Sequence, residues 1–389
     1  RNRAKINEKF IKTQKFIWNK KKVYGIKLFM SRLINIINFK KDKIFNKKFN
    51  KILLISGQRS FYKTGADKLF ETKFAEKQKF LYLKKSYSPN FEELKEIIYL
   101  REKINPDLII AIGGGCVMDY SKIVSVFKNT TNLKKRIINS DYKKRDKIPI
   151  LAIPTTAGSG AEVTSNAVIY INNIKYSVEG SEIRPDYYTL LPKLLLSSSQ
   201  RIDSSSGFDA ISQAIESILS KKSNSESISY ASKALKLLFN NYTDFVTKKN
   251  VYNSHKMAVG ANLAGKAINI SKTTAPHALS YPFTSFFNVP HGHAVSLTLN
   301  KFLKFNNRFQ NRADSEFNLK KRFELLFNLS NSKNISDLDK YLIKIKKVAK
   351  LEQNFENLGI NIKKNYSKII GGLNNQRLKN NPIKISKKD

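Results

Sequence analysis

Four short apolar runs in the first half of the chain place the strongest limit on its fold. The runs are Lys51–Gly57 (KILLISG), Lys79–Leu83 (KFLYL), Pro106–Ile112 (PDLIIAI) and Ile148–Ile153 (IPILAI). Each has the length of a buried strand, and segments with helical spacing, residues 90–103 and 118–127, lie between them. Strands that alternate with helices predict a parallel sheet that is covered by helices.

The second half of the chain has a different pattern. From about Asp203 onward the apolar residues follow helical spacing, and strand signals are few. The helical segments are 204–220, 226–247, 252–270, 291–304 and 314–350. A chain of 389 residues is also too long for one ordinary core. We therefore predict an α/β domain with a Rossmann-like sheet over residues 1–190 and an all-helical domain over residues 191–389.

The formal net charge of +41 has two explanations. Charge concentrated in a tail or stripe would indicate a protein that binds nucleic acid or a membrane surface. Here Lys is spread over almost every segment, with only modest enrichment in residues 1–51, so a general bias toward Lys, Asn and Ile explains the charge better. We expect no nucleic-acid partner, and a basic nucleic-acid-binding protein is the alternative from another functional class.

Targeting features are also absent from the sequence. No run of eighteen apolar residues occurs, so we expect no membrane span. The first residues, RNRAKINEKFIKTQKF, lack the apolar core and cleavage site of a secretory signal. A single cysteine, Cys116, excludes an internal disulfide. Together these features predict a cytoplasmic protein.

Two of the apolar runs lead into loops of small residues. The first loop, in IAIGGGCVMDYSKIV, comes directly before a helix; the second, in PTTAGSGAEVT, is rich in hydroxyl groups. Glycine allows a phosphate to approach the backbone, and a helix N-terminus presents free N–H groups. The G-x-G-x-x-G fingerprint is missing, and either loop alone could be only a tight turn. Two such loops after adjacent strands predict a nucleotide cradle.

Three of the four histidines lie in PHALSYPFTSFFNVPHGH, the stretch that ends at His293. His277 and His291 are separated by Pro282 and Pro290, so they cannot share one uninterrupted helix, but a bend would bring them together. Two imidazoles with a carboxylate are a usual ligand set for a divalent transition metal. Taken without other evidence, the histidines could equally be structural.

Further upstream, Asp209 and Gln213 are four residues apart in GFDAISQAIES, so they would share one face of a helix. Few polar residues surround them, which argues against an ordinary solvated surface.

The four motifs together resemble the iron-containing (group III) alcohol dehydrogenases. GGGCVMD, PTTAGSGAEVT, DAISQAIES and HALSYPF…PHG occur in the order and spacing of that family, and the resemblance runs from Val23–Gly25 to LNNQRLKNNPI at 373–383. It implies the dehydroquinate synthase-like fold, in which the α/β domain binds a nicotinamide dinucleotide and the helical domain holds a divalent metal. The implied cofactors are NAD or NADP and Fe²⁺ or Zn²⁺, and the implied assembly is a homodimer.

The resemblance also assigns roles to individual residues. The implied metal ligands are Asp209, Gln213, His277 and His291, and the implied cofactor-binding residues are Gly57, Gly113, Gly114, Gly115, Asp119, Thr155, Thr156, Ser159 and Lys175. Gln213 departs from the family, which usually has His there, and an amide oxygen binds such a metal more weakly than imidazole. Tyr281 stands where many relatives have a second His for proton relay. Gly57 stands where relatives that prefer NAD have Asp, so NADP is as acceptable as NAD.

Within the family the chain is most similar to the phosphonoacetaldehyde reductases, through DAISQAIES and KTTAPHALSYPFTSFFNVPHGHAVSLTL. This resemblance implies reduction of phosphonoacetaldehyde to 2-hydroxyethylphosphonate. The candidate catalytic residues are Tyr281, His277 and Lys272, and the candidates for holding the phosphonate are Lys272, His293 and Arg184. His255 is expected to be structural. The alternatives are a general metal-dependent short-chain alcohol dehydrogenase, and a dehydroquinate synthase or glycerol-phosphate dehydrogenase.

Overall fold

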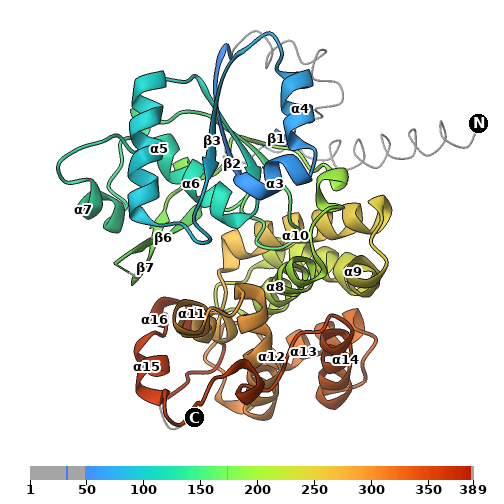
Figure 1. Ribbon diagram of the computed structural model, residues 1–389. Helices are drawn as coiled ribbons and strands as arrows, with labels where there is room; N and C mark the ends of the chain where they lie inside the picture. Colours follow the sequence, from blue (N-terminus) through green and yellow to red (C-terminus); the bar gives the residue numbers. More distant parts are fainter. Residues whose placement is uncertain (1–31, 34–48, 173, 387–389) are drawn as a thin grey trace, which may run out of the picture. The chain divides into compact units, whose positions relative to one another are not determined.

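The computed structural model describes residues 32–33, 49–172 and 174–386. The first residues of the family resemblance, Val23–Gly25, and most of the Lys-rich stretch 1–51 lie outside the described part of the chain. Two regions follow one another along the sequence, first strands with helices and then helices alone (Figure 1). The boundary at residues 190 and 191 stays a prediction.

A six-stranded parallel sheet forms the first region, in the order β1-β8-β5-β4-β2-β3. The strands are β1 (Arg32–Leu33), β2 (Lys51–Gly57), β3 (Gln78–Lys84), β4 (Leu108–Gly113), β5 (Ile150–Pro154) and β8 (Tyr187–Tyr188). All four predicted strands are therefore confirmed, with ends that shift by at most two residues. The parallel sheet expected from the alternating pattern is confirmed as well.

Helices cover both faces of this sheet, which explains why the strands are apolar along their whole length. The helices are α3 (Gln58–Lys63), α4 (Ala66–Lys73), α5 (Phe91–Ile104), α6 (Gly115–Val126) and α7 (Leu133–Ile138). Side chains alternate along a strand, so Leu53 and Ile55 pack with α5 and α6, whereas Ile52 and Leu54 pack with α3 and α4. The sheet is the middle layer of three.

An antiparallel hairpin was not expected from the sequence. It consists of β6 (Asn166–Ile171) and β7 (Ile174–Glu179) and forms a separate two-stranded sheet. The inward side chains of β6 alternate with partly exposed ones, and Lys175 lies near the start of β7. The hairpin matters for the site because it brings Lys175 toward the helical region.

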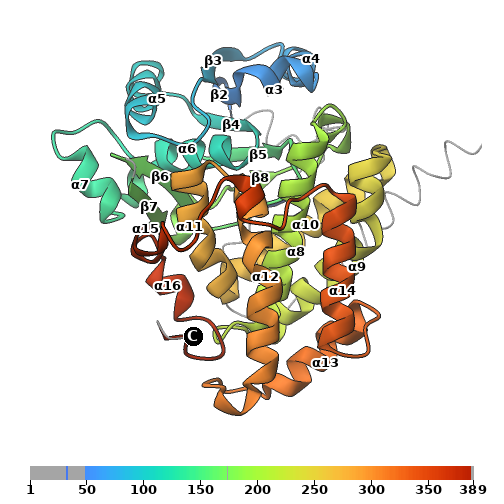
Figure 2. The same cartoon turned by 60° about the horizontal axis from the view of Figure 1, so that its bottom comes forward.

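The second region is a set of helices around a central one, α8 (Gln200–Leu219). Nearly every residue of α8 from Asp203 onward is buried, and α9 (Ser225–Thr247), α10 (Val251–Ser271) and α12 (His291–Arg308) pack against it (Figure 2). The predicted helices in these segments are confirmed. Side chains of Asn224 and Asn250 cap α9 and α10 through reciprocal hydrogen bonds, which fixes where both helices begin.

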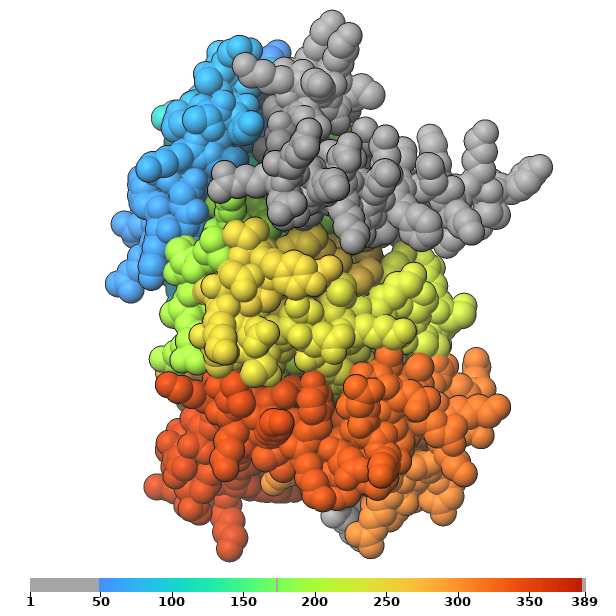
Figure 3. Space-filling view, turned by 90° about the vertical axis from the view of Figure 1, so that its right-hand side faces the viewer, coloured from blue at the N-terminus to red at the C-terminus, as the bar shows by residue number. Residues whose placement is uncertain are grey.

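The expected helical stretch 314–350 is two helices, α13 (Leu319–Leu329) and α14 (Ile335–Val348), both packed against α9. Figure 3 shows the yellow surface of α9 and α10 next to the orange-to-red surface of these later helices. Two short helices follow, α15 (Tyr366–Gly371) and α16 (Asn375–Leu378). Within the described residues, no helix is both long and apolar enough to cross a membrane.

The helix α11 (Ala275–Phe287) was missed because Pro282 lies inside it. Pro282 interrupts the helical pattern without ending the helix, although it cannot donate a backbone hydrogen bond. The bend expected between the two histidines occurs after Phe287, where Asn288 adopts a left-handed conformation. His277 therefore lies on α11, and His291 is the first residue of α12.

A close backbone approach joins the loop after β5 to α10. Gly160 has φ +60°, and a Cβ atom there would lie 2.5 Å from the Cα atom of Gly265. Nearby, Asn262 donates a 2.8 Å hydrogen bond to the buried Glu162. Only glycine satisfies both the positive φ and the contact, so these residues fix the loop that follows β5 against the helical region.

Candidate metal and nucleotide site

The small-residue loops leave the sheet side by side. Gly113 at the end of β4 lies opposite Pro154 at the end of β5, and the backbone N–H of Thr155 donates a 3.0 Å hydrogen bond to the Gly113 carbonyl. Gly57 ends β2, the neighbour of β4 on its other side. The carboxyl ends of parallel strands are the usual binding edge of an α/β sheet, so these residues share the expected edge.

The three consecutive glycines have different surroundings. A Cβ atom on Gly113 would lie 2.5 Å from the Val117 side chain, so this glycine is needed for packing. A Cβ atom on Gly114 would lie 3.5 Å from Thr156 Oγ1, which is an ordinary contact. Gly114 is also the N-cap of α6 and provides no capping side chain. The first turn of α6 can therefore offer N–H groups to an anion.

Asp119 lies one turn further along α6, beside the hairpin. Burial raises the pKa of its carboxyl group to about 6, although Lys122, a backbone hydrogen bond at Val168 and Lys175 act in the opposite direction. Lys122 is fully buried and donates hydrogen bonds to Thr164 Oγ1 and to the Asn166 carbonyl, both at 2.9 Å. Lys175 is the side chain that connects this edge with the helical region electrostatically.

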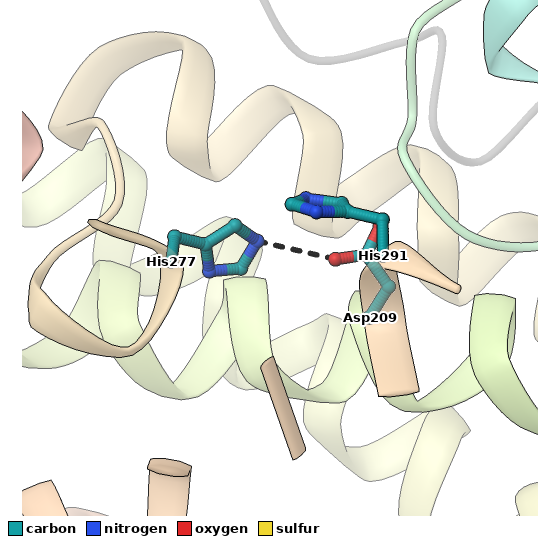
Figure 4. Close-up of side chains that lie close together, drawn as sticks. All are labelled: Asp209, His277 and His291. Atoms are coloured by element: carbon teal, nitrogen blue, oxygen red, sulfur yellow. Dashed lines mark hydrogen bonds and ion pairs between the residues drawn. The ribbon is translucent and has the colours of Figure 1, made fainter. Parts of the chain in front are cut away.

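Asp209, His277 and His291 converge in the helical region (Figure 4). One ligand atom from each residue lies within 4.8 Å of the others. Asp209 comes from the buried helix α8, His277 from the first turns of α11 and His291 from the start of α12. Asp209 and His277 are buried, whereas His291 is partly exposed. Such a site closes around an ion on one side and leaves it accessible on the other.

His277 is held in place by two carboxylates. Its Nε2 lies 3.1 Å from Asp209 Oδ1, and its Nδ1 lies 2.5 Å from Glu216 Oε1. The second oxygen of Glu216 accepts hydrogen bonds from the backbone N–H of Thr274 at 2.7 Å and from its hydroxyl at 3.0 Å. Glu216 therefore orients the imidazole, as outer carboxylates commonly do for histidines that bind metals.

The charges around the two histidines differ. Burial would lower the pKa of His277, but Glu216 and Asp209 outweigh it and raise the pKa to about 10. For His291, burial lowers the pKa to about 3, and Asp209 opposes this only in part. The lowered pKa favours the neutral imidazole of His291, whose Nδ1 lies 3.5 Å from Ser280 Oγ. A divalent cation would take the place of the proton that His277 shares with Asp209, which is the exchange expected on metal binding.

Gln213 completes the candidate ligand set. Its Nε2 donates a 3.1 Å hydrogen bond to Asp209 Oδ2. Its Oε1 is buried and has no hydrogen-bond partner among the described residues. A buried carbonyl oxygen without a partner is costly, and an adjacent cation would satisfy it. The donor set of one carboxylate, two imidazoles and one amide oxygen therefore fits a divalent metal ion.

Tyr281 lies between the metal cluster and the hairpin. Its ring stacks on His291, with 6.0 Å between the ring centroids, and the Lys175 ammonium lies 3.4 Å from the centroid of the Tyr281 ring. Burial would raise the pKa of the Tyr281 phenol, but Lys175, Arg377 and His277 outweigh it and lower the pKa. The cationic groups thus stabilise negative charge at the edge of the metal cluster.

The three candidates for holding a phosphonate lie in different places. Lys272 is the C-cap of α10, just before α11. Arg184 lies between β7 and β8, beside Asp186. His293 Nε2 lies 2.7 Å from the Glu352 carbonyl oxygen, and the residue lines a cavity of about 440 Å³ that none of the metal-cluster residues lines. Only Lys272 lies near the Arg377 that acts on Tyr281.

Sequence reasoning missed two residues that contact this site, Glu216 and Arg377. Glu216 is seven residues after Asp209 in DAISQAIES, which places both on one face of α8, so a signal was present. Arg377 lies in the closing motif, far from every other site residue in sequence. No local spacing relates it to the cluster. His255, expected to be structural, lies within α10.

Two family models match the chain. The model described as iron-containing alcohol dehydrogenase matches residues 38–192. The model described as the C-terminal part of the Fe-containing alcohol dehydrogenase family matches residues 204–389. The two matches are consecutive, in the order expected, and together cover most of the chain.

Individual relatives agree with these models. An alcohol dehydrogenase from Thermococcus barophilus is 30% identical over 57% of this chain, and a phosphonoacetaldehyde reductase from Streptomyces viridochromogenes is 31% identical over 52% of it. The matched segments span 59% and 54% of the relatives' own lengths. The crystal structure of a sulfoacetaldehyde reductase from Bifidobacterium kashiwanohense in complex with NAD⁺ has a TM-score of 0.82 and 23% identity, and covers 94% of this chain and 96% of its own. That similarity shows a common fold.

Proposed function

We propose that this chain, which belongs to the iron-containing alcohol dehydrogenase family, catalyses the metal-dependent and NAD(P)-dependent interconversion of a small aldehyde and its alcohol. In the direction of reduction, an aldehyde, NAD(P)H and a proton give an alcohol and NAD(P)⁺.

One observation carries the proposal: the convergence of Asp209, His277 and His291 at a site that Lys175 connects to the nucleotide edge of the sheet. Lys175 acts electrostatically on Asp119 at that edge and on Asp209 in the metal cluster. A metal site and a dinucleotide site that share one side chain are close enough to act on the same small substrate. Dehydrogenation requires such proximity, because hydride moves directly between cofactor and substrate.

Different residues of the chain would have different roles in the reaction. When bound, the metal would polarise the carbonyl oxygen as a Lewis acid, and the nicotinamide would supply or accept the hydride. Asp209, His277, His291 and Gln213 would hold the ion, and Glu216 would keep the His277 ring in the required orientation. Tyr281 stacks on His291, so its hydroxyl group is the candidate for moving a proton to or from the substrate oxygen.

The edge of the sheet would bind the cofactor. The N–H groups at the start of α6 would hold the pyrophosphate, with Gly114 allowing its close approach and with Thr155, Thr156 and Ser159 as hydroxyl donors. At the end of β2, Gly57 presents no carboxylate to a ribose 2′-phosphate. We therefore propose that both NADH and NADPH are accepted.

For the substrate we propose a small aldehyde that carries an anionic group, with phosphonoacetaldehyde as the first candidate. The support is the 31% identity to a phosphonoacetaldehyde reductase and the cations Lys175 and Lys272 on this side of the molecule. The competing substrate class is uncharged short alcohols, as in a general short-chain alcohol dehydrogenase.

A direct assay tests the reaction class. Metal-free protein is supplied with Fe²⁺ or Zn²⁺, with NADH or NADPH, and with a panel of aldehydes, and the loss of absorbance of the reduced cofactor is followed. Reduction of at least one aldehyde that requires added metal supports the proposal. No oxidation of either cofactor with any aldehyde, in metal-loaded protein, contradicts it.

A further inference from the structure

We propose that Arg377, together with Lys272, binds the anionic head group of the substrate, so that the enzyme selects short aldehydes with a tetrahedral phosphonate or sulfonate at the other end. This inference rests on the proposed function, because it places the head group relative to the same metal cluster. It extends the proposed function by assigning specificity to Arg377, a residue to which the family resemblance gives no role.

Arg377 is held rigidly against α11. The backbone N–H of Asn374 donates to the Ala278 carbonyl at 3.3 Å, and the Asn380 side chain donates to the Thr273 carbonyl at 3.0 Å. These two bonds lie on either side of Arg377 in sequence and attach the segment to the start of the helix that carries His277. The Asn374 side chain also accepts a 2.9 Å hydrogen bond from the Arg377 backbone N–H and so begins α16.

The Arg377 guanidinium group has spare hydrogen-bonding capacity. Its side chain is only 14% exposed, yet its ion pair with Glu179 is a single contact of 3.5 Å with a carboxylate that is 42% exposed. Its other described neighbours are the Tyr281 phenol, with which it can share a side-chain hydrogen bond, and the Lys272 ammonium group, which it repels. Guanidinium has five N–H donors in a planar fork that matches phosphonate and sulfonate oxygens. A mostly buried guanidinium group with so few partners has N–H donors available for a ligand.

Lys272 adds a second cation with no partner of its own. Its ammonium group makes no hydrogen bond or ion pair with any residue that the structure describes, and the charges that act on it are those of Glu179, Arg377 and Lys222. Its backbone has φ 59° and ψ 173°, a conformation that side-chain-bearing residues rarely adopt. Strained backbone of this kind is found mostly where function requires the position of a side chain.

The charges do not balance without a ligand. Lys272 and Arg377 act on one another beside Glu179, so two cations face a single carboxylate that is 42% exposed. Like charges in a partly buried site repel one another, and a dianion between Lys272 and Arg377 would relieve this repulsion. An uncharged substrate would leave it in place.

The position relative to the metal cluster sets the length of the substrate. Tyr281 stacks on His291 on one side and lies under the influence of Arg377 on the other. A molecule with its carbonyl oxygen at the cluster and its anionic group at Arg377 therefore spans about one tyrosine side chain. This arrangement favours a short aldehyde as the substrate.

The test compares charged and uncharged aldehydes in matched variants. The kcat/KM values for phosphonoacetaldehyde, sulfoacetaldehyde and propanal are measured with metal-loaded wild type, Arg377→Gln, Arg377→Lys, Lys272→Gln and Glu179→Gln. We expect Arg377→Gln to lower kcat/KM for the two anionic aldehydes about a hundredfold more than for propanal, as for loss of one charge-assisted hydrogen-bonded contact, because any effect through Tyr281 is shared by all three substrates. Arg377→Lys should restore part of the loss, and phosphonoacetaldehyde should be affected more than the singly charged sulfoacetaldehyde.

Glu179→Gln separates recognition from structure. It removes the carboxylate partner of Arg377 but keeps the guanidinium group, so it should leave the preference for anionic aldehydes intact or increase it. Melting temperatures of all variants show whether each is folded. Equal losses for propanal and for the anionic aldehydes in Arg377→Gln, or a wild-type preference for propanal, would overturn the inference while leaving the proposed reaction class in place. A wild type that reduces none of the three would instead contradict the proposed function itself.

Discussion

The two sides of the candidate site are built from opposite kinds of residues. On the nucleotide side, the edge of the sheet offers backbone N–H groups, glycines and hydroxyl groups around Gly114 and Thr156. On the helical side, Asp209, Glu216 and His277 are charged or titratable groups buried in a dense hydrogen-bond network. The first side can bind an anion through uncharged groups, whereas the second requires a cation to balance its carboxylates.

This difference determines how each side responds to amino-acid substitution. The nucleotide side depends on the absence of side chains, so an added methyl group either disturbs packing or blocks a ligand, depending on the position. The helical side depends on groups that satisfy one another, so removal of one leaves another buried and unpaired, which is strongly destabilising for charged partners. The predictions below test this contrast, beginning with the largest effect.

Substitution of a metal ligand should have the largest effect. His277→Ala removes one of three converging ligands and leaves Glu216 and Asp209 without their shared partner. We expect kcat/KM for aldehyde reduction to fall about a thousandfold or more, since Lewis-acid stabilisation of the alkoxide is worth several kcal/mol. The measurements are steady-state kinetics and metal content per chain. His255→Asn, on α10, is the matched control and should keep its metal; if it loses as much metal as His277→Ala, the assignment of ligands is incorrect.

Glu216→Gln should have the next largest effect, although Glu216 is not proposed to touch the metal. The amide keeps the size of the side chain but lowers the basicity of the group that faces His277 Nδ1. We expect metal affinity to fall about 10- to 100-fold, as for other residues that orient a ligand. Titration of metal-free protein with Zn²⁺ measures this affinity directly. An unchanged affinity would contradict the proposal that Glu216 orients His277 for metal binding.

Two neighbouring glycines provide the sharpest contrast on the nucleotide side. Gly113→Ala would place its Cβ 2.5 Å from Val117, so the free energy of unfolding should fall by about 1–3 kcal/mol. Gly114→Ala has room within the protein, so its unfolding should be nearly unchanged while its affinity for NAD(P)H falls about tenfold, because the methyl group occupies the space of a phosphate oxygen. Urea denaturation and fluorescence titration with NADPH distinguish the two. The same response from both variants would argue against a phosphate at Gly114.

The smallest effect is expected at Gly57. Gly57→Asp introduces a carboxylate at the end of β2, and its Cβ would lie 2.7 Å from the flexible Ser60 hydroxyl group and 3.9 Å from the Lys84 side chain. A carboxylate near a 2′-phosphate in a solvated site costs about 1 kcal/mol, so the KM for NADPH should rise about fivefold and that for NADH should not rise. Parallel kinetics with both cofactors measure the ratio, and an unchanged ratio would place the ribose elsewhere.

The same contrast explains what the sequence could predict. On the nucleotide side, each loop follows its strand directly, so Gly113–Gly115 and Thr155–Ser159 were predictable from local pattern once the strands at 108–113 and 150–154 were recognised. Their proximity follows from the parallel pairing of β4 and β5. Local sequence and sheet geometry were sufficient there.

On the helical side, local pattern was not sufficient. Asp209 is 68 residues from His277, and their meeting depends on how α8, α11 and α12 pack. The helix α11 was not predicted because a proline lies inside it. The hairpin of β6 and β7, which carries Lys175, was not predicted because no turn motif was recognised between its strands. Arg377 reaches the site through tertiary contacts of the chain's last residues, and no periodicity relates it to α11. The family resemblance supplied the metal ligands but neither Glu216 nor Arg377.

The central claim is that the cluster of Asp209, His277 and His291 binds a metal ion that aldehyde reduction requires. The most direct measurement is NAD(P)H oxidation by chelator-treated protein as Fe²⁺ or Zn²⁺ is added in steps. The account predicts negligible activity without metal and a rise that saturates at one ion per chain in wild type, with no recovery in His277→Ala. Full aldehyde reduction by protein shown to contain no metal would contradict it.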